Sequence, residues 1–399
     1  MRNRLTTRII SSIITVGLLC LSLLASRWVP FGHSMKDVVK GPSEDRLLQV
    51  QGGEEIVGLQ ILKVYNSRNS PLKVLFPMSI FQDRAGRFWI GGEGEALLQM
   101  YDEYTNEWTT FTDEDTVAGL HYNSGAVFPY PLEQITQDAD GNLWFSSRSR
   151  IAGKPIITTL NGNNWRRIEL ERGPWEFHST GMFVGGNGKP RVWLEDRVLN
   201  VEEHRLLPFL KLSQAMTKGA HRALIQSEED DVPEYEISSA VEDGSGSIWF
   251  GTRSGILRYA IQTSTFATYS QNIILNADRI YKDRDGRLWF INPRGEIQVY
   301  NTKGRSWLSY NLFQHLPNAE HSDPVGKLII RTQGICQDKL GRMIFATDRG
   351  LIIFSQAKNT WQFSNAKNSR LPHSNIMSIL EDRLGRVWIG TKKGILVAR

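Results

Sequence analysis

Histidine and aromatic side chains gather in the connecting segments of this chain. These segments hold six of the eight histidines, namely His121, His178, His221, His315, His321 and His373. They also hold the aromatic residues Tyr122, Tyr130, Trp175, Phe177 and Tyr235. Imidazoles can serve as metal ligands or as a general acid and base, and aromatic rings can stack on a flat ligand.

The spacing of the histidines matches no metal or catalytic motif. No His-x-His or His-x-x-x-His pair occurs, and no glutamate accompanies them in a zinc pattern. The chain also lacks a nucleophile elbow, a glycine-rich phosphate loop and a close pair of carboxylates. We therefore predict no catalytic residue, no metal site and no cofactor. The candidate ligand-binding residues in these segments are His121, His221, His315, Tyr130, Trp175 and Tyr235.

Two acidic turns resemble the start of a calcium-binding loop. They read DADGN from Asp138 and DRDG from Asp283. A loop of this type needs a bidentate glutamate at its twelfth position, where Ser149 and Arg294 stand instead. We interpret the aspartates as acceptors for backbone amides within a tight turn.

These aspartates belong to a unit that repeats along the chain: an apolar strand, a tight turn, then Gly-x-apolar-Trp-apolar. Seven copies start at Ile80, Ile135, Phe183, Ala240, Ile280, Ile335 and Ile379, the third being degenerate. Their turn glycines lie roughly 50 residues apart. Six copies carry tryptophan, at Trp89, Trp144, Trp193, Trp249, Trp289 and Trp388. We expect these rings to occupy one position of the second strand and to pack between neighbouring sheets.

Each period contains four short strands, which in the fifth copy read RIYKD, LWFIN, EIQVYN and SWLSYN. Four-stranded units that repeat at this period, with turn residues between the strands, are typical of blades around a central channel. Abundant tryptophan and glycine, 12 and 35 residues, also favour many short strands. The sequence therefore predicts an all-β, seven-bladed β-propeller over residues 60–399.

The seventh copy has only three strands. The other six end in a fourth, outer strand, which reads EWTTF, NWRRI, HRLLPF, TFATYS, SWLSYN or TWQFSN. Near the N-terminus, LKVYNSRNSPL (residues 62–72) parallels WQFSNAKNSRL (residues 361–371). We predict that this N-terminal segment is the fourth strand of the last blade, because such pairing removes an open edge and ties the chain ends together.

The units resemble the two-component-regulator propeller repeat, whose pattern runs apolar-x-x-Asp-x-x-Gly-x-apolar-Trp-apolar-Gly-Thr-x-x-Gly-apolar. The resemblance covers about residues 60–399 and is strongest at IWFGTRSGIL and VWIGTKKGIL, in copies four and seven. Copy six has Ile344 in place of tryptophan, and copy three has Gly185 in place of aspartate. The resemblance implies an extracytoplasmic propeller, often the ligand-sensing part of a membrane histidine kinase. The lyase that opens streptogramin B antibiotics is similar to the chain in blade pattern only.

Cations recur in the turns between the second and third strands. They include Arg148, Arg253, Arg294, Arg349 and Lys392, in five of the seven blades. A closed ring would array them around one mouth, where they would focus positive potential on an incoming anion. We therefore predict an acidic glycan or another anionic ligand, gripped by arginine and stacked on the aromatic residues. General basicity is the alternative, since Arg84, Arg284 and Arg383 occupy the opposite turns.

The first 27 residues predict a signal peptide or a membrane anchor. Arg2, Arg4 and Arg8 precede an apolar run over residues 9–25, and basic flanks stay in the cytoplasm. We expect retention as an anchor, because a leucine stands before Ala25 where cleavage prefers a small residue. Residues 28–59 would then be a linker, and the propeller would lie outside the plasma membrane.

The net charge of +5 is spread through turns and forms no run, so we predict no nucleic acid partner. Cys20 and Cys336 are too distant in sequence and setting to suggest a disulfide. We expect an extracytoplasmic ligand-binding or sensor propeller without its own kinase, which signals through a membrane partner such as a histidine kinase. The alternatives are a lyase or hydrolase that uses the histidines, and a protein-protein interaction scaffold, because fold alone does not decide function.

Overall fold

The computed structural model divides into two compact units, Met1–Lys36 and Asp37–Arg399. The structure describes residues 38–40, 55–56, 58–94, 97–111, 132–147, 156–169, 180–194, 197–202, 205–212, 236–252, 255–269, 277–316 and 331–399, all in the second unit. In these ranges we find no helix with the length and apolarity that crossing a membrane requires. The predicted anchor, residues 1–27, lies outside the described residues.

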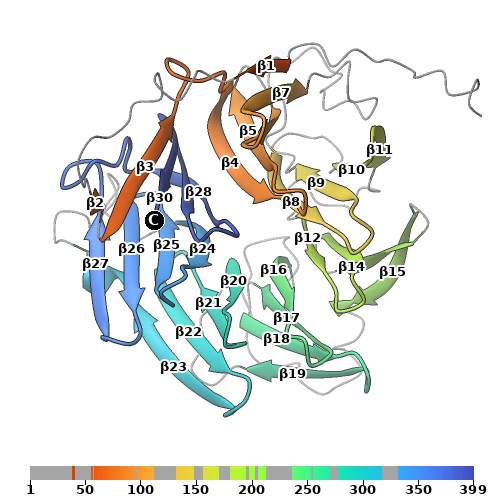
Figure 1. The fold of residues 1–399 in the computed structure, drawn as a ribbon. Coiled ribbons are helices and arrows are strands. Elements are labelled where there is room, and N and C mark those ends of the chain that lie inside the picture. Colours follow the sequence, from red (N-terminus) through yellow and green to blue (C-terminus); the bar gives the residue numbers. More distant parts are fainter. Residues whose placement is uncertain are drawn as a thin grey trace, which may run out of the picture. The chain divides into compact units, whose positions relative to one another are not determined.

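The described residues of the second unit form seven antiparallel sheets (Figure 1). From the innermost strand outward, the first sheet contains β4 (Val74–Gln82), β5 (Phe88–Gly94), β6 (Leu98–Asp102) and β7 (Glu107–Phe111). The second contains β8 (Leu132–Gln137), β9 (Leu143–Ser147), β10 (Ile156–Asn161) and β11 (Asn164–Glu169). The third contains β12 (Thr180–Val184), β13 (Pro190–Leu194), β14 (Arg197–Glu202) and β15 (Arg205–Lys211).

The remaining sheets follow the same order. The fourth contains β16 (Ile237–Glu242), β17 (Ser247–Thr252), β18 (Gly255–Ala260) and β19 (Thr265–Tyr269). The fifth contains β20 (Arg279–Lys282), β21 (Leu288–Ile291), β22 (Glu296–Asn301) and β23 (Ser306–Asn311). The sixth contains β24 (Thr332–Gln337), β25 (Met343–Thr347), β26 (Gly350–Ser355) and β27 (Thr360–Ser364). The seventh contains β28 (Ile376–Glu381), β29 (Val387–Thr391), β30 (Gly394–Ala398) and β3 (Leu59–Tyr65).

The innermost strands form a closed ring. Each of them packs against the innermost strand of the next sheet, and β28 packs against β4. The chain is therefore a seven-bladed β-propeller, as predicted, and the strands of the fifth copy lie where the sequence placed them. Among the described strands, the innermost strand of every blade pairs with one neighbour, and its other edge faces the central channel.

The N-terminal segment completes the last blade, as predicted. Strand β3 pairs antiparallel with β30, with Ile61 opposite Ala398 and Tyr65 opposite Ile395. The Tyr65 ring is buried and stacks on Trp388, with 5.8 Å between the ring centroids and an interplanar angle of 11°. Two short strands add to outer edges: β2 (Glu55–Ile56) pairs with β3, and β1 (Val38–Lys40) pairs with β7.

In six of the seven blades, the turn between the first and second strands carries an aspartate that is hydrogen-bonded to the following strand. One carboxylate oxygen accepts the backbone N–H four residues on. In four blades it also accepts the backbone N–H two residues on, which is the bond that the turn interpretation predicts. The other oxygen accepts the tryptophan indole N–H at 2.8–2.9 Å in five blades, in the pairs Asp83–Trp89, Asp138–Trp144, Asp243–Trp249, Asp283–Trp289 and Asp382–Trp388. The turn and the large buried ring are thus fixed by one side chain.

Hydrogen bonding lowers the pKa of one of these carboxyls, that of Asp243. Burial by itself raises the pKa of Asp243, but hydrogen bonds from Trp249, Ser245 and Ser247 outweigh it, so that this pKa lies below its ordinary value. The ionised carboxyl therefore contributes stability above the ordinary aspartate pKa, and this contribution is lost as the pH falls through the lowered pKa.

The third blade departs from the pattern, and the prediction that all six tryptophans share one position is wrong there. Arg191 lies opposite Phe183, as Trp89 lies opposite Phe81, whereas Trp193 lies opposite Gly181. Since Gly185 replaces the aspartate, the buried Trp193 indole N–H has no partner among the described residues. The vacated position holds a buried ion pair in which Arg191 binds the Glu242 carboxylate of the fourth blade at 3.0 Å.

A serine on the innermost strand ties blades together at three seams. The hydroxyls of Ser79, Ser239 and Ser378 donate to the backbone oxygens of Leu132, Ala277 and Pro77, each in the next blade. The residue opposite the serine on the second strand is a glycine, such as Gly251 or Gly390. A Cβ at either glycine would collide with that serine hydroxyl and with the carbonyl it binds. The glycine of the repeat therefore permits the close approach of neighbouring blades.

Candidate functional site

The turns between the second and third strands carry the described part of the predicted mouth. They open on the same face as the connections between blades. In the sixth and seventh blades the turn is fixed by a threonine, since Thr347 and Thr391 donate to the backbone oxygens of Gly350 and Gly394 at 2.7 and 2.9 Å. The threonine hydrogen bonds therefore fix the backbone of the two turns that carry Arg349 and Lys392.

Two of the three described cations contact aromatic rings. The Arg349 guanidinium lies 5.9 Å from the ring centroid of Phe313, in the short 3-10 helix η2 (Leu312–His315) that follows the fifth blade. The Lys392 ammonium lies 5.7 Å from the ring centroid of Phe76 in the first blade. Arg294 is exposed on the turn of the fifth blade. Three adjacent blades thus present a cation on one face.

Titratable neighbours modify the charge of this face. Burial raises the pKa of Asp348, which adjoins Arg349 and accepts the backbone N–H of Arg331 at 3.2 Å. Burial and the charges of Lys392 and Lys393 lower the pKa of His373, whose Nδ1 accepts the backbone N–H of Asn375 at 2.9 Å. The imidazole is therefore neutral around neutral pH, and lysine and arginine supply the positive charge.

His315 lies apart from the innermost strands. Its ring stacks on Trp361 of β27, the outermost strand of the sixth blade, with 4.2 Å between the centroids and an angle of 5°. Burial lowers the pKa of the imidazole. Among the described contacts, His315 meets none of Arg294, Arg349 and Lys392.

The other predicted site residues lie outside the described residues and stay predictions; they are Arg148, Arg253, Tyr130, Trp175, Tyr235, His121 and His221. Within the part of the chain that the structure describes, no group of three or more His, Cys, Asp or Glu side chains could hold a metal ion.

Cys336 is a buried free thiol on β24.

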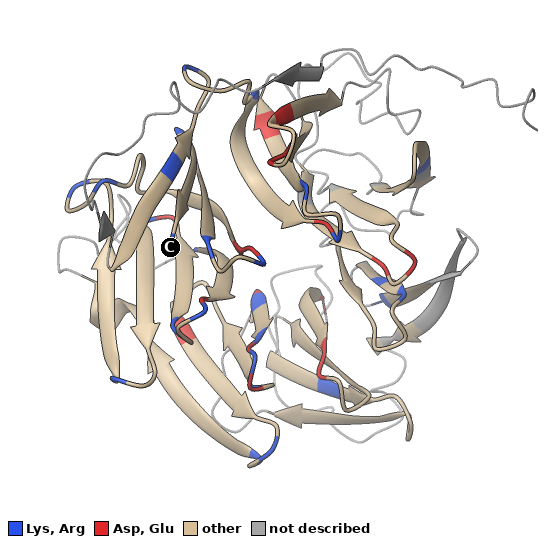
Figure 2. Ribbon diagram, in the orientation of Figure 1, with Lys and Arg blue, Asp and Glu red and all other residues tan. Residues whose placement is uncertain are grey.

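The arginines of the opposite turns connect neighbouring blades, a role that the sequence did not indicate. The backbone N–H groups of Arg84, Arg284 and Arg383 donate to Gln137, Gln337 and Gln82, each in the next blade. Their guanidinium groups donate at 2.7 Å to the backbone oxygens of Ala139, Asp338 and Arg84. Many of the charged residues lie in turns (Figure 2). On this face, these three arginines connect neighbouring blades.

A further set of arginines on that face pairs with the turn aspartates. The Nε of Arg87, Arg287, Arg342 and Arg386 lies 2.6–2.8 Å from the carboxylate four residues earlier. Arg386 also binds Glu103 of the first blade through both of its terminal nitrogens, at 2.8 and 2.6 Å. These cations are therefore largely compensated, which weakens the general-basicity alternative.

Residues 370–393 match the family described as "Two component regulator propeller". A comparison with curated proteins found no significant match. Among solved structures, the chain is similar to the extracellular domain assigned to the hybrid two component system BT3049 of B. thetaiotaomicron, with 17% identity and a TM-score of 0.56. That match covers 82% of this chain and 40% of the other, so the chain spans about two fifths of the length of this relative.

Two further structures share the fold but differ in described activity. A streptogramin B lyase is 15% identical over 84% of this chain and 96% of its own, with a TM-score of 0.57. YCF48 bound to D1 peptide is 15% identical over 82% of this chain and 93% of its own, with a TM-score of 0.52. At these identities the likeness concerns the propeller alone.

Proposed function

We propose that this chain, built from the two-component regulator propeller repeat, is an extracytoplasmic ligand-binding or sensor protein whose ligand is an acidic glycan or another anion. The observation that carries the proposal is the row of Arg294, Arg349 and Lys392 on one face of three adjacent blades. Side chains of this kind attract and grip carboxylates and sulfates. The likeness to extracellular domains of hybrid two-component systems supports a signalling partner in the membrane, such as a histidine kinase.

The ligand proposal is tested with a triple variant, Arg294→Gln, Arg349→Gln and Lys392→Gln. We expect binding to an acidic glycan array to weaken by roughly 10- to 100-fold, because charge-assisted hydrogen bonds are lost. The loss should shrink as salt is raised. The matched control is Lys189→Gln, Lys303→Gln and Lys358→Gln, three exposed lysines of the opposite turns.

Arg84, Arg284 and Arg383 are unsuitable as a control, because their removal would loosen the seams between blades. Equal losses in the two triple variants would refute the proposal, as would equal binding of neutral and acidic glycans by the native chain. Both variants should unfold at the temperature of the native chain, since none of the six side chains is buried.

The proposed location is tested by a reporter fused after Arg399. Because three arginines precede the apolar run of residues 9–25, we expect the propeller to be exported. An enzyme that is active only outside the cytoplasm, such as an alkaline phosphatase, should therefore be active in the fusion. Activity of a cytoplasm-restricted reporter at the same position would contradict the location.

A further inference from the structure

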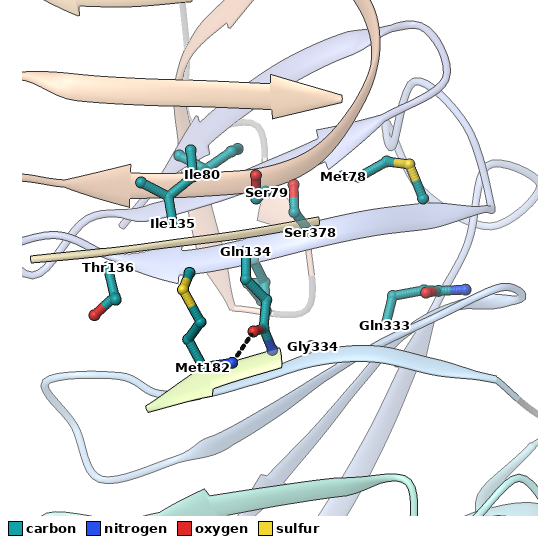
Figure 3. A pocket seen from close by; sticks show the side chains of 11 residues that line it. Met78, Ser79, Ile80, Gln134, Ile135, Thr136, Met182, Gln333, Gly334 and Ser378 are labelled. Atoms are coloured by element: carbon teal, nitrogen blue, oxygen red, sulfur yellow. Dashed lines mark hydrogen bonds between the residues drawn. The ribbon is translucent and has the colours of Figure 1, made fainter. Parts of the chain in front are cut away.

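The central channel contains a cavity of about 300 Å³ that none of the predicted site residues lines. Its wall comes from the innermost strands of five blades (Figure 3). The lining residues are Met78, Ser79, Ile80, Gln134, Ile135, Thr136, Met182, Gln333, Gly334, Ser378 and Ile379. None of these side chains is charged, so the cavity differs in chemistry from the cationic face.

Irregularities of the innermost strands place two of the longer side chains in this wall. The pairing register shifts between Pro77 and Ser79 and between Thr332 and Gly334. The extra residues at these bulges are Met78 and Gln333, and a bulge redirects the side chain of its extra residue. The same shift recurs in other blades, which indicates a regular feature of the channel.

The cavity wall offers hydrogen-bond donors and acceptors. The Oε1 of Gln134 accepts the backbone N–H of Met182 at 2.7 Å (Figure 3), which orients its amide nitrogen as a donor. The Gln333 amide and the Thr136 hydroxyl form no hydrogen bond with another described residue. Among the described strands, the channel-facing edge of each innermost strand has no strand partner, so backbone N–H and C=O groups that no side chain binds can also contact a ligand.

One end of the channel is partly spanned by an ion pair. Arg284, on the turn after the first strand of the fifth blade, reaches past the sixth blade to Glu381 of the seventh. All lining residues except Thr136 lie two to four positions before the last residue of their strand, where the turn toward the Arg284 end begins. We therefore expect a ligand to enter from the face that carries the cationic turns.

We propose that this cavity binds a neutral, polyhydroxylated molecule of about monosaccharide size. A volume near 300 Å³ is at the small end of ligand pockets. Hydroxyl groups both donate and accept, which suits a wall of amides, hydroxyls and strand edges. The side chains of Ile80, Ile135 and Met182 supply apolar surface for C–H groups. A charged molecule would lose its hydration without gaining an ion pair.

The test measures binding of D-glucose, D-galactose, D-xylose and sodium D-glucuronate to the full chain by calorimetry at millimolar concentration. Two variants remove a hydrogen-bonding group from the cavity wall with little change of volume: Gln333→Leu and Thr136→Val. Their matched controls are Gln362→Leu and Thr268→Val, which make the same changes at exposed positions on outermost strands. We expect at least one neutral sugar to bind and each cavity variant to weaken it roughly three- to tenfold.

The proposal is overturned if no neutral sugar binds, if glucuronate binds as well as the neutral sugars, or if the cavity variants bind like their controls. Thr136→Val keeps the shape of the side chain, so it serves where Gln333→Leu disturbs folding. This site and the cationic face are separable. The Arg294, Arg349 and Lys392 triple variant should keep its sugar binding, and Gln333→Leu should keep its binding to acidic glycans.

Discussion

Deletion of residues 61–72 is expected to abolish stable folding of the propeller. This segment contains most of β3, which pairs with β30 and closes the ring. Its loss exposes the edge of β30 and empties the space of Tyr65, whose side chain is 1% exposed and packs on Trp388. Truncation of one buried aromatic residue to alanine costs about 3–5 kcal/mol, and total domain stability is about 5–15 kcal/mol.

Thermal unfolding of the full and deleted chains measures this effect, with aggregation followed by light scattering. The point variant Tyr65→Ala should lower the free energy of unfolding by about 3–5 kcal/mol. Tyr104→Ala is its control, because the Tyr104 side chain is 98% exposed and its removal should change stability by less than about 0.5 kcal/mol. Equal melting of the full and deleted chains would rule out closure by β3.

Asp382→Ala is expected to produce the second largest loss, about 3 kcal/mol or more of unfolding free energy. The Asp382 carboxylate accepts the Trp388 indole N–H at 2.9 Å and the backbone N–H groups of Leu384 and Arg386 at 2.9 Å each. It also pairs with the Arg386 guanidinium at 2.6 Å. Alanine leaves the buried indole and the turn amides without an acceptor, and each stranded buried group costs about 1–3 kcal/mol.

The sixth blade supplies the matched control, Asp338→Ala. Asp338 accepts from Leu340 and Arg342 in the same way, but Ile344 replaces the tryptophan, so no indole depends on it. We expect Asp338→Ala to cost about 1 kcal/mol less than Asp382→Ala in chemical denaturation. Equal losses would show that the indole hydrogen bond contributes little.

The sequence predicted those parts of the fold that a repeated pattern specifies. The period, the four strands of the fifth copy and the N-terminal strand that completes the last blade all follow from similarity between segments, and all are confirmed, with the pairing to β30 ending at Tyr65. The turn role of Asp283 also follows from local chemistry. The repeat period, the strands and the turns depend on residues that are close in sequence, or on the sequence similarity of one segment to another.

Contacts between blades could not be read from the pattern, because they depend on how strands distant in sequence are aligned. The seam contacts of Ser378 and Arg383 with residues 301 positions away are examples. The different position of Trp193 could have been predicted from the sequence. Trp193 follows its turn glycine, Gly188, by five residues, whereas Trp89 follows Gly86 by three. Most of the candidate site stays a prediction, because its residues lie outside those that the structure describes.

Closure by β3 also constrains the order in which the molecule can be assembled. Strand β3 is synthesised early, but it cannot pair until β30 has left the ribosome, which happens only after the other six blades have been synthesised. Pairings this far apart in sequence form slowly, because a long loop must close before any contact compensates for the lost entropy. Until then the nascent chain carries an apolar strand without its partner, which is a site for misassembly with other chains. We therefore expect docking of β3 onto β30 to be the last and slowest step of folding. Until it docks, we expect chaperones to bind the unpaired strand.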